Sequence, residues 1–247
     1  MEPQSPYFSK KIHPEDQIAL ESITAPRKWD SKTFNSIIKA VGTLGGGISI
    51  PARNRPDEIN TDSLAPVVNQ LVGITTKEGI EVARPLFVDT RNQKLVFSND
   101  ITRGTNKSVV STIQEPDFLR RRDFAFIGEF HTHPMSDLSY YTAHGFSDVD
   151  YLTFLEDRRP QISMLAYGPT EKLLLLKTSV TPNNVSSEKI SKDLNRIKEE
   201  FFGKKVSTIP QAMKLIADMN RMVCVEFGLT LYKSTQGYDF KRINVVG

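Results

Sequence analysis

The chain has 247 residues, of which 38% are hydrophobic and 25% charged, and its formal net charge is +3. These proportions are typical of a globular protein, and the mild charge gives no case for a nucleic-acid-binding surface, which needs clustered Lys and Arg. The single cysteine, Cys224, excludes an internal disulfide and fits a reducing compartment.

The N-terminal region has the composition of an extension. Residues 1–30 hold several prolines and polar residues without the apolar run of a secretory signal, and we expect them to be loosely ordered. Apolar side chains at helical spacing predict a short helix that ends at Gly42, and residues 51–62 are typical of a linker. No apolar run approaches the roughly 20 residues that a membrane helix needs, so we expect a cytoplasmic protein.

Residues 61–99 predict a helix followed by a β-hairpin. The first strand contains Glu81, the turn lies near Arg91, and the second strand returns over residues 94–98. Residues 99–117 are polar and predict an irregular crossing or another edge strand.

Residues 123–133 alternate as a β-strand does. The alternation places Phe130 on one face and Ile127, His131 and His133 on the other, so both imidazoles point the same way. Two residues of strand advance about 6.6 Å, and side chains at that separation can converge on one ion held at about 2.0–2.1 Å from each nitrogen.

Residues 147–156 predict the first turns of a helix, with Ser147 as N-cap and Asp150 at the third helical position. Alone, this pattern indicates a capping box, and a lone His-x-His is usually a surface or core feature. Together, His131, His133 and Asp150 supply the three ligands of a catalytic zinc site that keeps a fourth position for water. We therefore predict a Zn2+ site with Ser147 beside the open position.

The remaining sequence predicts elements that continue the sheet and cover it. They are strands over 162–168 and 172–180, helices over 187–202 and 210–222, and closing strands over 223–232 and 240–246. The two strands after the helix at Ser147 should lie beside the histidine strand. The whole pattern indicates an α/β fold with a central mixed β-sheet flanked by helices.

The two motifs His131-Thr132-His133-Pro134 and Ser147-Asp148-Val149-Asp150 resemble the signature of the JAMM, or MPN-plus, metalloprotease family. That signature is His-x-His-Pro, a short loop and Ser-x-x-Asp, with a glutamate on an earlier strand. Here the loop over 134–146 is longer than in most members. It offers Tyr140 and Tyr141 for gripping a peptide, and His144 or Asp137 as alternative metal contacts.

The resemblance implies a domain organisation. A core with JAMM/MPN-like, cytidine-deaminase-like layering is expected over residues 61–180. Residues 1–60 then form an N-terminal extension and linker, and residues 181–247 add C-terminal helices and closing strands. Nothing in the sequence indicates an oligomeric state.

The resemblance also implies a glutamate general base. Glu81 is the expected residue, because helix, glutamate, strand and hairpin follow in the family's order. Glu78 is the alternative if Gly79 forms a bulge or turn that re-aims it. Glu129 shares the face of the histidines, and we interpret it as a carboxylate that supports a ligand.

The predicted chemistry is amide hydrolysis. A zinc-bound water has a pKa near 7, Glu81 takes its proton and returns it to the departing amine, and the Ser147 hydroxyl stabilises the oxyanion. The family cleaves peptide and isopeptide bonds, often at the carboxyl terminus of ubiquitin-like proteins, which implies a protein or peptide substrate.

Two alternatives remain from the sequence. One is a catalytically silent MPN-like scaffold or protein-binding module. The other is a barrel-type metal hydrolase, which is disfavoured because its His-x-His lies on the first barrel strand, whereas this pair falls past the midpoint of the chain.

Overall fold

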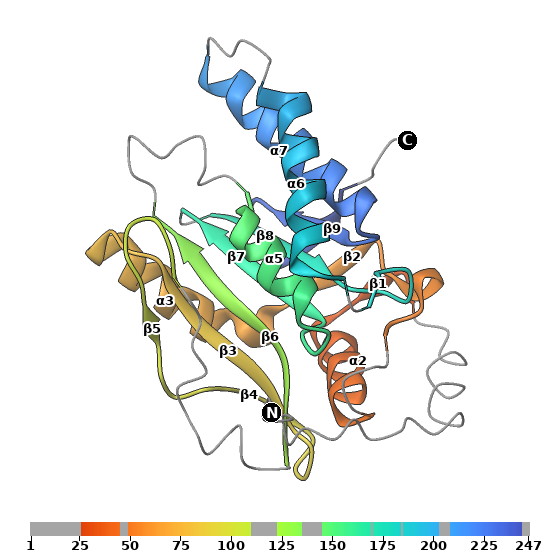
Figure 1. Ribbon diagram of the computed structural model, residues 1–247. Coiled ribbons are helices and arrows are strands. Elements are labelled where there is room, and N and C mark those ends of the chain that lie inside the picture. The colour runs from red at the N-terminus through yellow and green to blue at the C-terminus, as the bar shows by residue number, and fades with distance from the viewer. Residues whose placement is uncertain are drawn as a thin grey trace, which may run out of the picture.

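The computed structural model describes residues 26–44, 49–109, 123–134, 145–168, 170–183, 185–202 and 208–243. Within them, ten strands form one open, mixed sheet with helices on both faces (Figure 1). The α/β architecture with a central mixed sheet is therefore confirmed. None of the described helices is long and apolar enough to span a membrane.

The sheet has the order β1-β2-β10-β9-β8-β7-β6-β3-β4, and β5 pairs with β3. Strands β6 and β7 are parallel, as are β1 and β2, and the other pairs are antiparallel. A parallel pair needs a crossover connection, and the one between β6 and β7 contains helix α5. The strands are β1 (Lys28–Trp29), β2 (Glu58–Asn60), β3 (Val82–Asp89), β4 (Lys94–Phe97), β5 (Thr102–Arg103), β6 (Phe124–His133), β7 (Ile162–Tyr167), β8 (Glu171–Leu176), β9 (Thr230–Ser234) and β10 (Asp239–Arg242).

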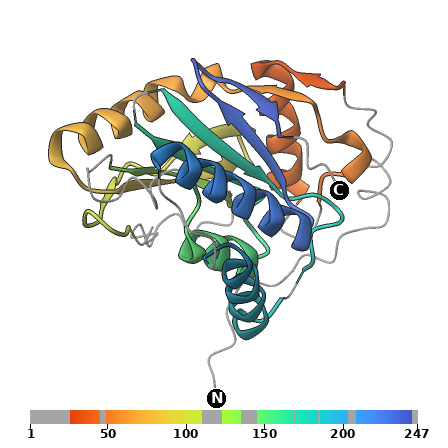
Figure 2. The same ribbon diagram turned by 90° about the horizontal axis from the view of Figure 1, so that it is seen from above.

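The helices form two layers, one on each face of the sheet (Figure 2). Helices α2 and α3 share one hydrophobic core with the sheet, and α5, α6 and α7 share the other. The helices are α2 (Ser31–Leu44), α3 (Ala65–Glu78), α5 (Asp148–Glu156), α6 (Ser187–Phe202) and α7 (Ile209–Glu226), with short 3-10 turns η1 (Ala52–Asn54) and η2 (Asp62–Leu64).

The histidine strand is less regular than its sequence predicts. Its pairing with β3 shifts between Leu86 and Phe87, so that Ile127 is an additional residue in β6. Ile127 packs in the same core as Phe130, and its predicted position on the opposite face is wrong. A β-bulge adds one residue to a strand, so the alternation of side chains between the two faces of the sheet is interrupted there.

Two other expectations about local structure are corrected. The predicted linker over 51–62 contains β2, because Ile59 is buried where this strand pairs with both β1 and β10. The predicted strand over 223–232 begins too early, since α7 continues to Glu226 and β9 begins at Thr230. Residues 1–25 and 110–122, which include much of the predicted extension and polar crossing, lie outside the described residues.

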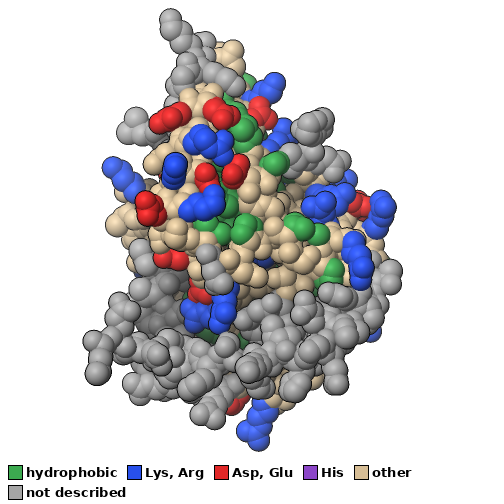
Figure 3. Space-filling model, turned by 45° about the vertical axis from the view of Figure 1, so that its right-hand side comes forward, with side chains coloured by type: hydrophobic (Ala, Val, Ile, Leu, Met, Phe, Trp, Pro, Cys, Tyr) green, Lys and Arg blue, Asp and Glu red, His purple; other side chains and the backbone are tan. Residues whose placement is uncertain are grey.

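Charged side chains of both signs are intermixed on the face drawn in Figure 3, with hydrophobic side chains between them in small groups. Among the described residues, surface ion pairs join Lys189 with Asp193 and Arg196 with Glu226. Surface ion pairs of this kind contribute at most about 1 kcal/mol each to the free energy of unfolding. The two hydrophobic cores therefore contribute more to the stability of the fold than these pairs do.

Candidate metal centre

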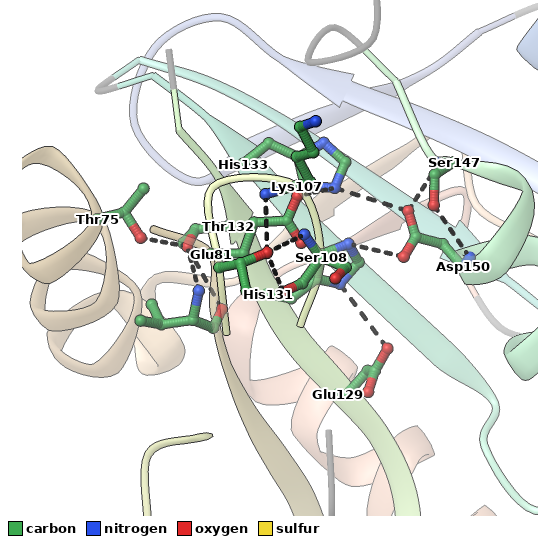
Figure 4. Close-up of polar contacts among 12 residues, drawn as sticks. Thr75, Glu81, Lys107, Ser108, Glu129, His131, Thr132, His133, Ser147 and Asp150 are labelled. Atoms are coloured by element: carbon green, nitrogen blue, oxygen red, sulfur yellow. Dashed lines mark hydrogen bonds and ion pairs between the residues drawn. The ribbon is translucent and has the colours of Figure 1, made fainter. Parts of the chain in front are cut away.

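Two elements bring three potential metal ligands together. His131 and His133 lie at the carboxyl end of β6, and Asp150 lies in the first turn of α5 (Figure 4). One ligand atom from each side chain lies within 4.8 Å of the others, and both histidines are buried. The structure thus brings together the three residues that the sequence predicts as ligands, and this group could hold a metal ion.

A capping box fixes the position of Asp150. Ser147 is the N-cap of α5, and its Oγ accepts a hydrogen bond from the Asp150 N–H at 3.2 Å. In return, Asp150 Oδ2 accepts one from the Ser147 N–H at 2.6 Å. The capping and ligand interpretations of Asp150 are therefore compatible, because Oδ1 is not used by the cap.

The Asp150 carboxylate lies close to both imidazoles, and the distance from its Oδ1 to His131 matches that between two ligands of a tetrahedral zinc ion. Asp150 Oδ1 lies 3.4 Å from His131 Nε2, and Asp150 Oδ2 lies 3.7 Å from His133 Nε2. Ligands held at 2.0–2.1 Å from tetrahedral zinc are about 3.4 Å apart. Both ring nitrogens of His131 are buried without a hydrogen-bond partner of acceptable geometry, which is costly unless another group satisfies them.

The electrostatics of the metal-free group are those of an ion pair. Burial opposes the charged form of His131, but Asp150, and also Glu129 and Glu81, outweigh it and raise the imidazole pKa to about 9. Burial opposes ionisation of Asp150 as well, yet His131 and His133 hold the pKa of this carboxyl well below its usual range. The site therefore favours a compact positive charge beside Asp150.

Glu81 lies next to the ligand group, directly before β3. Its Oε1 is 3.8 Å from His133 Nε2, and its backbone is fixed by hydrogen bonds with Gly104 and Thr105. Burial raises the pKa of the Glu81 carboxyl to about 7, although His131 and a hydrogen bond from the Val109 backbone oppose the increase. A buried carboxylate with such a pKa is suited to proton transfer near neutral pH.

Within the described residues, the other predicted candidates for the general base and for metal contacts do not lie among the three ligand atoms. The Glu78 alternative needed a bulge or turn at Gly79 that re-aims Glu78. Gly79 ends α3 in a left-handed conformation, but Glu78 Oε2 pairs with Arg103 Nε at 3.2 Å. Glu129 Oε1 lies 3.7 Å from His131 Nδ1, behind the ring. Residues 135–144 of the long loop, including Asp137 and His144, lie outside the described residues.

The sequence did not reveal the role of Thr132, which lies between the two histidines and is buried. Its Oγ1 hydrogen-bonds with Thr75 Oγ1 of α3, accepts the Val82 N–H at 3.2 Å and lies 3.3 Å from the Val82 carbonyl oxygen (Figure 4). These bonds anchor the start of β3 beside Glu81. A hydroxyl at a buried strand position needs hydrogen-bond partners. The presence of threonine between the two histidines of a predicted strand was therefore the sequence signal for this role.

Cys224 is not part of the centre. It is buried on α7, and burial raises the pKa of its thiol to about 12. It therefore remains a neutral thiol that packs as a small apolar side chain.

No known protein-family model matches the chain, and no curated protein sequence matches it either. The resemblance to the JAMM family accordingly rests on the two motifs. The case for a metal centre rests on the geometry of His131, His133 and Asp150.

Proposed function

We propose that the protein is a zinc-dependent peptidase or isopeptidase of the JAMM type. The observation that carries this proposal is the convergence of two buried imidazoles and one carboxylate, with Glu81 beside them. Two histidines and one carboxylate are a ligand set of catalytic zinc sites, which leave one position open, whereas structural sites use four protein ligands.

His131, His133 and Asp150 would hold the zinc, and Glu81 would transfer protons. Bound zinc lowers the pKa of a coordinated water and polarises the scissile carbonyl. Glu81 accepts a proton from the attacking water and donates it to the departing amine. Its place beside the ligands, with Oε1 3.8 Å from His133 Nε2, supports this exchange, because a general base must lie within reach of the proton that it takes.

Ser147 would stabilise the oxyanion. It is exposed at the N-terminus of α5, and its Oγ accepts from Asp150, so its own proton is available for an oxygen beside the metal. A fixed donor of this kind contributes about 2.7–4 kcal/mol to transition-state stabilisation.

The proposed substrate class comes from the motif resemblance. It is a peptide or isopeptide bond, with ubiquitin-like proteins among the candidate substrates. The proposed JAMM/MPN-like layering comes from the same resemblance.

We also propose that the enzyme acts in the cytoplasm. The support is compositional: a single cysteine, which the structure buries. No nucleic-acid or membrane partner is needed for the proposed reaction.

The test begins with metal content. Wild type purified without chelator is expected to contain about one zinc per chain by mass spectrometry, the stoichiometry of a single three-ligand site. His131→Ala and Asp150→Asn should lose it. Asp148→Asn is the matched control, because Asp148 lies in the same helical turn but pairs with Lys198. Folded wild type without zinc would contradict the proposal.

The second step is activity on ubiquitin dimers and peptide substrates. Glu81→Gln is expected to lower kcat by about 10²–10⁴-fold while zinc is retained, because it removes only proton transfer. Glu78→Gln should leave kcat unchanged, since Glu78 pairs with Arg103. Equal activity of wild type and Glu81→Gln would exclude Glu81 as the base.

A further inference from the structure

Asn220 of α7 is a buried amide that binds the segment leading into the metal centre. The residue is 2% exposed. Its Oδ1 accepts hydrogen bonds from Tyr151 Oη at 2.6 Å and from the Phe146 N–H at 3.2 Å. Its Nδ2 donates to the Ile216 carbonyl oxygen of its own helix at 2.9 Å, which fixes the orientation of the amide.

The two groups that donate to Asn220 flank the capping box. Phe146 immediately precedes Ser147, and Tyr151 immediately follows Asp150. One side chain of α7 therefore binds both ends of the four-residue stretch that carries the N-cap and the carboxylate ligand. The approach is close, because a Cβ at Gly145 would lie only 2.3 Å from Asn220 Nδ2, so this position requires glycine.

The same contacts reach the histidine side of the centre. The Phe146 ring packs edge-on against His131, with centroids 5.9 Å apart, and against Tyr151 at 5.8 Å. A shift of residues 145–147 would thus disturb both His131 and the first turn of α5. Cys224, one helical turn after Asn220, is buried in the same hydrophobic core as Tyr151 and Phe146.

We infer that Asn220 is a positioning residue of the metal centre, which holds the first turn of α5 so that Asp150 Oδ1 faces His131. This inference rests on the proposed function, because it takes Asp150 to be a metal ligand. Asn220 lies outside residues 61–180, the part of the chain that carries both motifs. The centre therefore depends on the C-terminal helices as well as on β6 and α5.

The inference is tested by the zinc affinity of folded protein, measured by competition with a chromophoric chelator. Asn220→Leu keeps the branched shape of the side chain, with slightly larger end groups, but removes the acceptor. Zinc should then bind about 10–100-fold more weakly, as when other groups that support metal ligands are removed. Val223→Ala is the control: it weakens packing of the same helix without a polar contact to residues 145–151. It should leave the zinc affinity unchanged, whereas a purely structural role predicts parallel losses in both variants.

Tyr151→Phe provides a second variant if Asn220→Leu does not fold. It removes one hydrogen bond to Asn220 and keeps the ring, so zinc affinity should fall by a smaller factor. In the double variant the losses should not add, since both changes break one connection. If Tyr151→Phe and folded Asn220→Leu both bind zinc with wild-type affinity, the inference about Asn220 is overturned, but the proposed function is not. Folded wild type that binds no zinc would overturn the proposed function and the inference with it.

Discussion

His131 should determine how the proposed metal centre responds to pH. A metal ion binds only the neutral imidazole, but in the metal-free protein Asp150 and the nearby glutamates outweigh burial and raise the His131 pKa to about 9. Zinc must therefore displace a proton at neutral pH. The raised pKa also stabilises the metal-free fold fully below pH 6.5, and this contribution is lost as the pH rises through about 9.

We accordingly expect zinc affinity to increase with pH between about 7 and 9, roughly tenfold per unit for the release of one proton. Chelator-buffered titrations across this range measure the slope. Calorimetry in two buffers of different ionisation enthalpy counts the protons released. An affinity that is flat across this range would show that His131 is already neutral in the metal-free protein.

At the scale of elements, the centre depends on how β3 and β6 are joined at their shared end. Thr132 Oγ1 satisfies the Val82 N–H at the point where the chain turns away to Glu81, and it also bonds α3 through Thr75. Thr132→Val keeps the shape and removes the hydroxyl. It should destabilise the fold by about 1–3 kcal/mol, the cost of a buried unpaired polar group.

Because Thr132 faces away from the ligands, the valine variant should keep its zinc while kcat falls with the displacement of Glu81. Thr132→Ser retains the hydroxyl and should recover kcat. Denaturant unfolding and zinc analysis measure the two effects separately. Loss of zinc with unchanged kcat per bound metal would assign Thr132 to the ligands instead.

The elements that the sequence predicted well are those with local signals. The apolar stripe of α6 and the capping box of α5 each lie within one short stretch of chain. The predicted end of α7 at residue 222 was too early. Val223, Cys224 and Phe227 are all buried, and a cluster of apolar residues fits a strand as well as a helix. Strand β2 and the bulge at Ile127 depend on partners distant in sequence.

The same distinction holds within the centre. The proximity of His131, His133 and Asp150 could be predicted because both motifs are short and their residues are typical metal ligands. The contacts of Thr132 with α3 and of Asn220 with Phe146 and Tyr151 join residues more than fifty positions apart. Nothing in the sequence near either residue indicates these partners.

For the whole molecule, the segments before and after the motif-bearing region join its sheet. Strands β1 and β2 from the N-terminal side and β9 and β10 from the C-terminal side extend it beyond β8. Helix α7 covers the face on which α5 lies (Figure 2). Folding of the sheet and formation of the metal centre should therefore be coupled.

Zinc should stabilise the whole fold, because its ligands from β6 and α5 come together only in the native structure. At a free zinc concentration of 100 times Kd, the free energy of unfolding should rise by about 2.7 kcal/mol. For a chain of this length, that corresponds to an increase in Tm of about 5–11 °C. Melting followed by circular dichroism with chelator-buffered zinc, against chelator alone, measures the shift. His131→Ala should show no shift, and equal Tm values for wild type in both conditions would mean that the ligands do not bind zinc together.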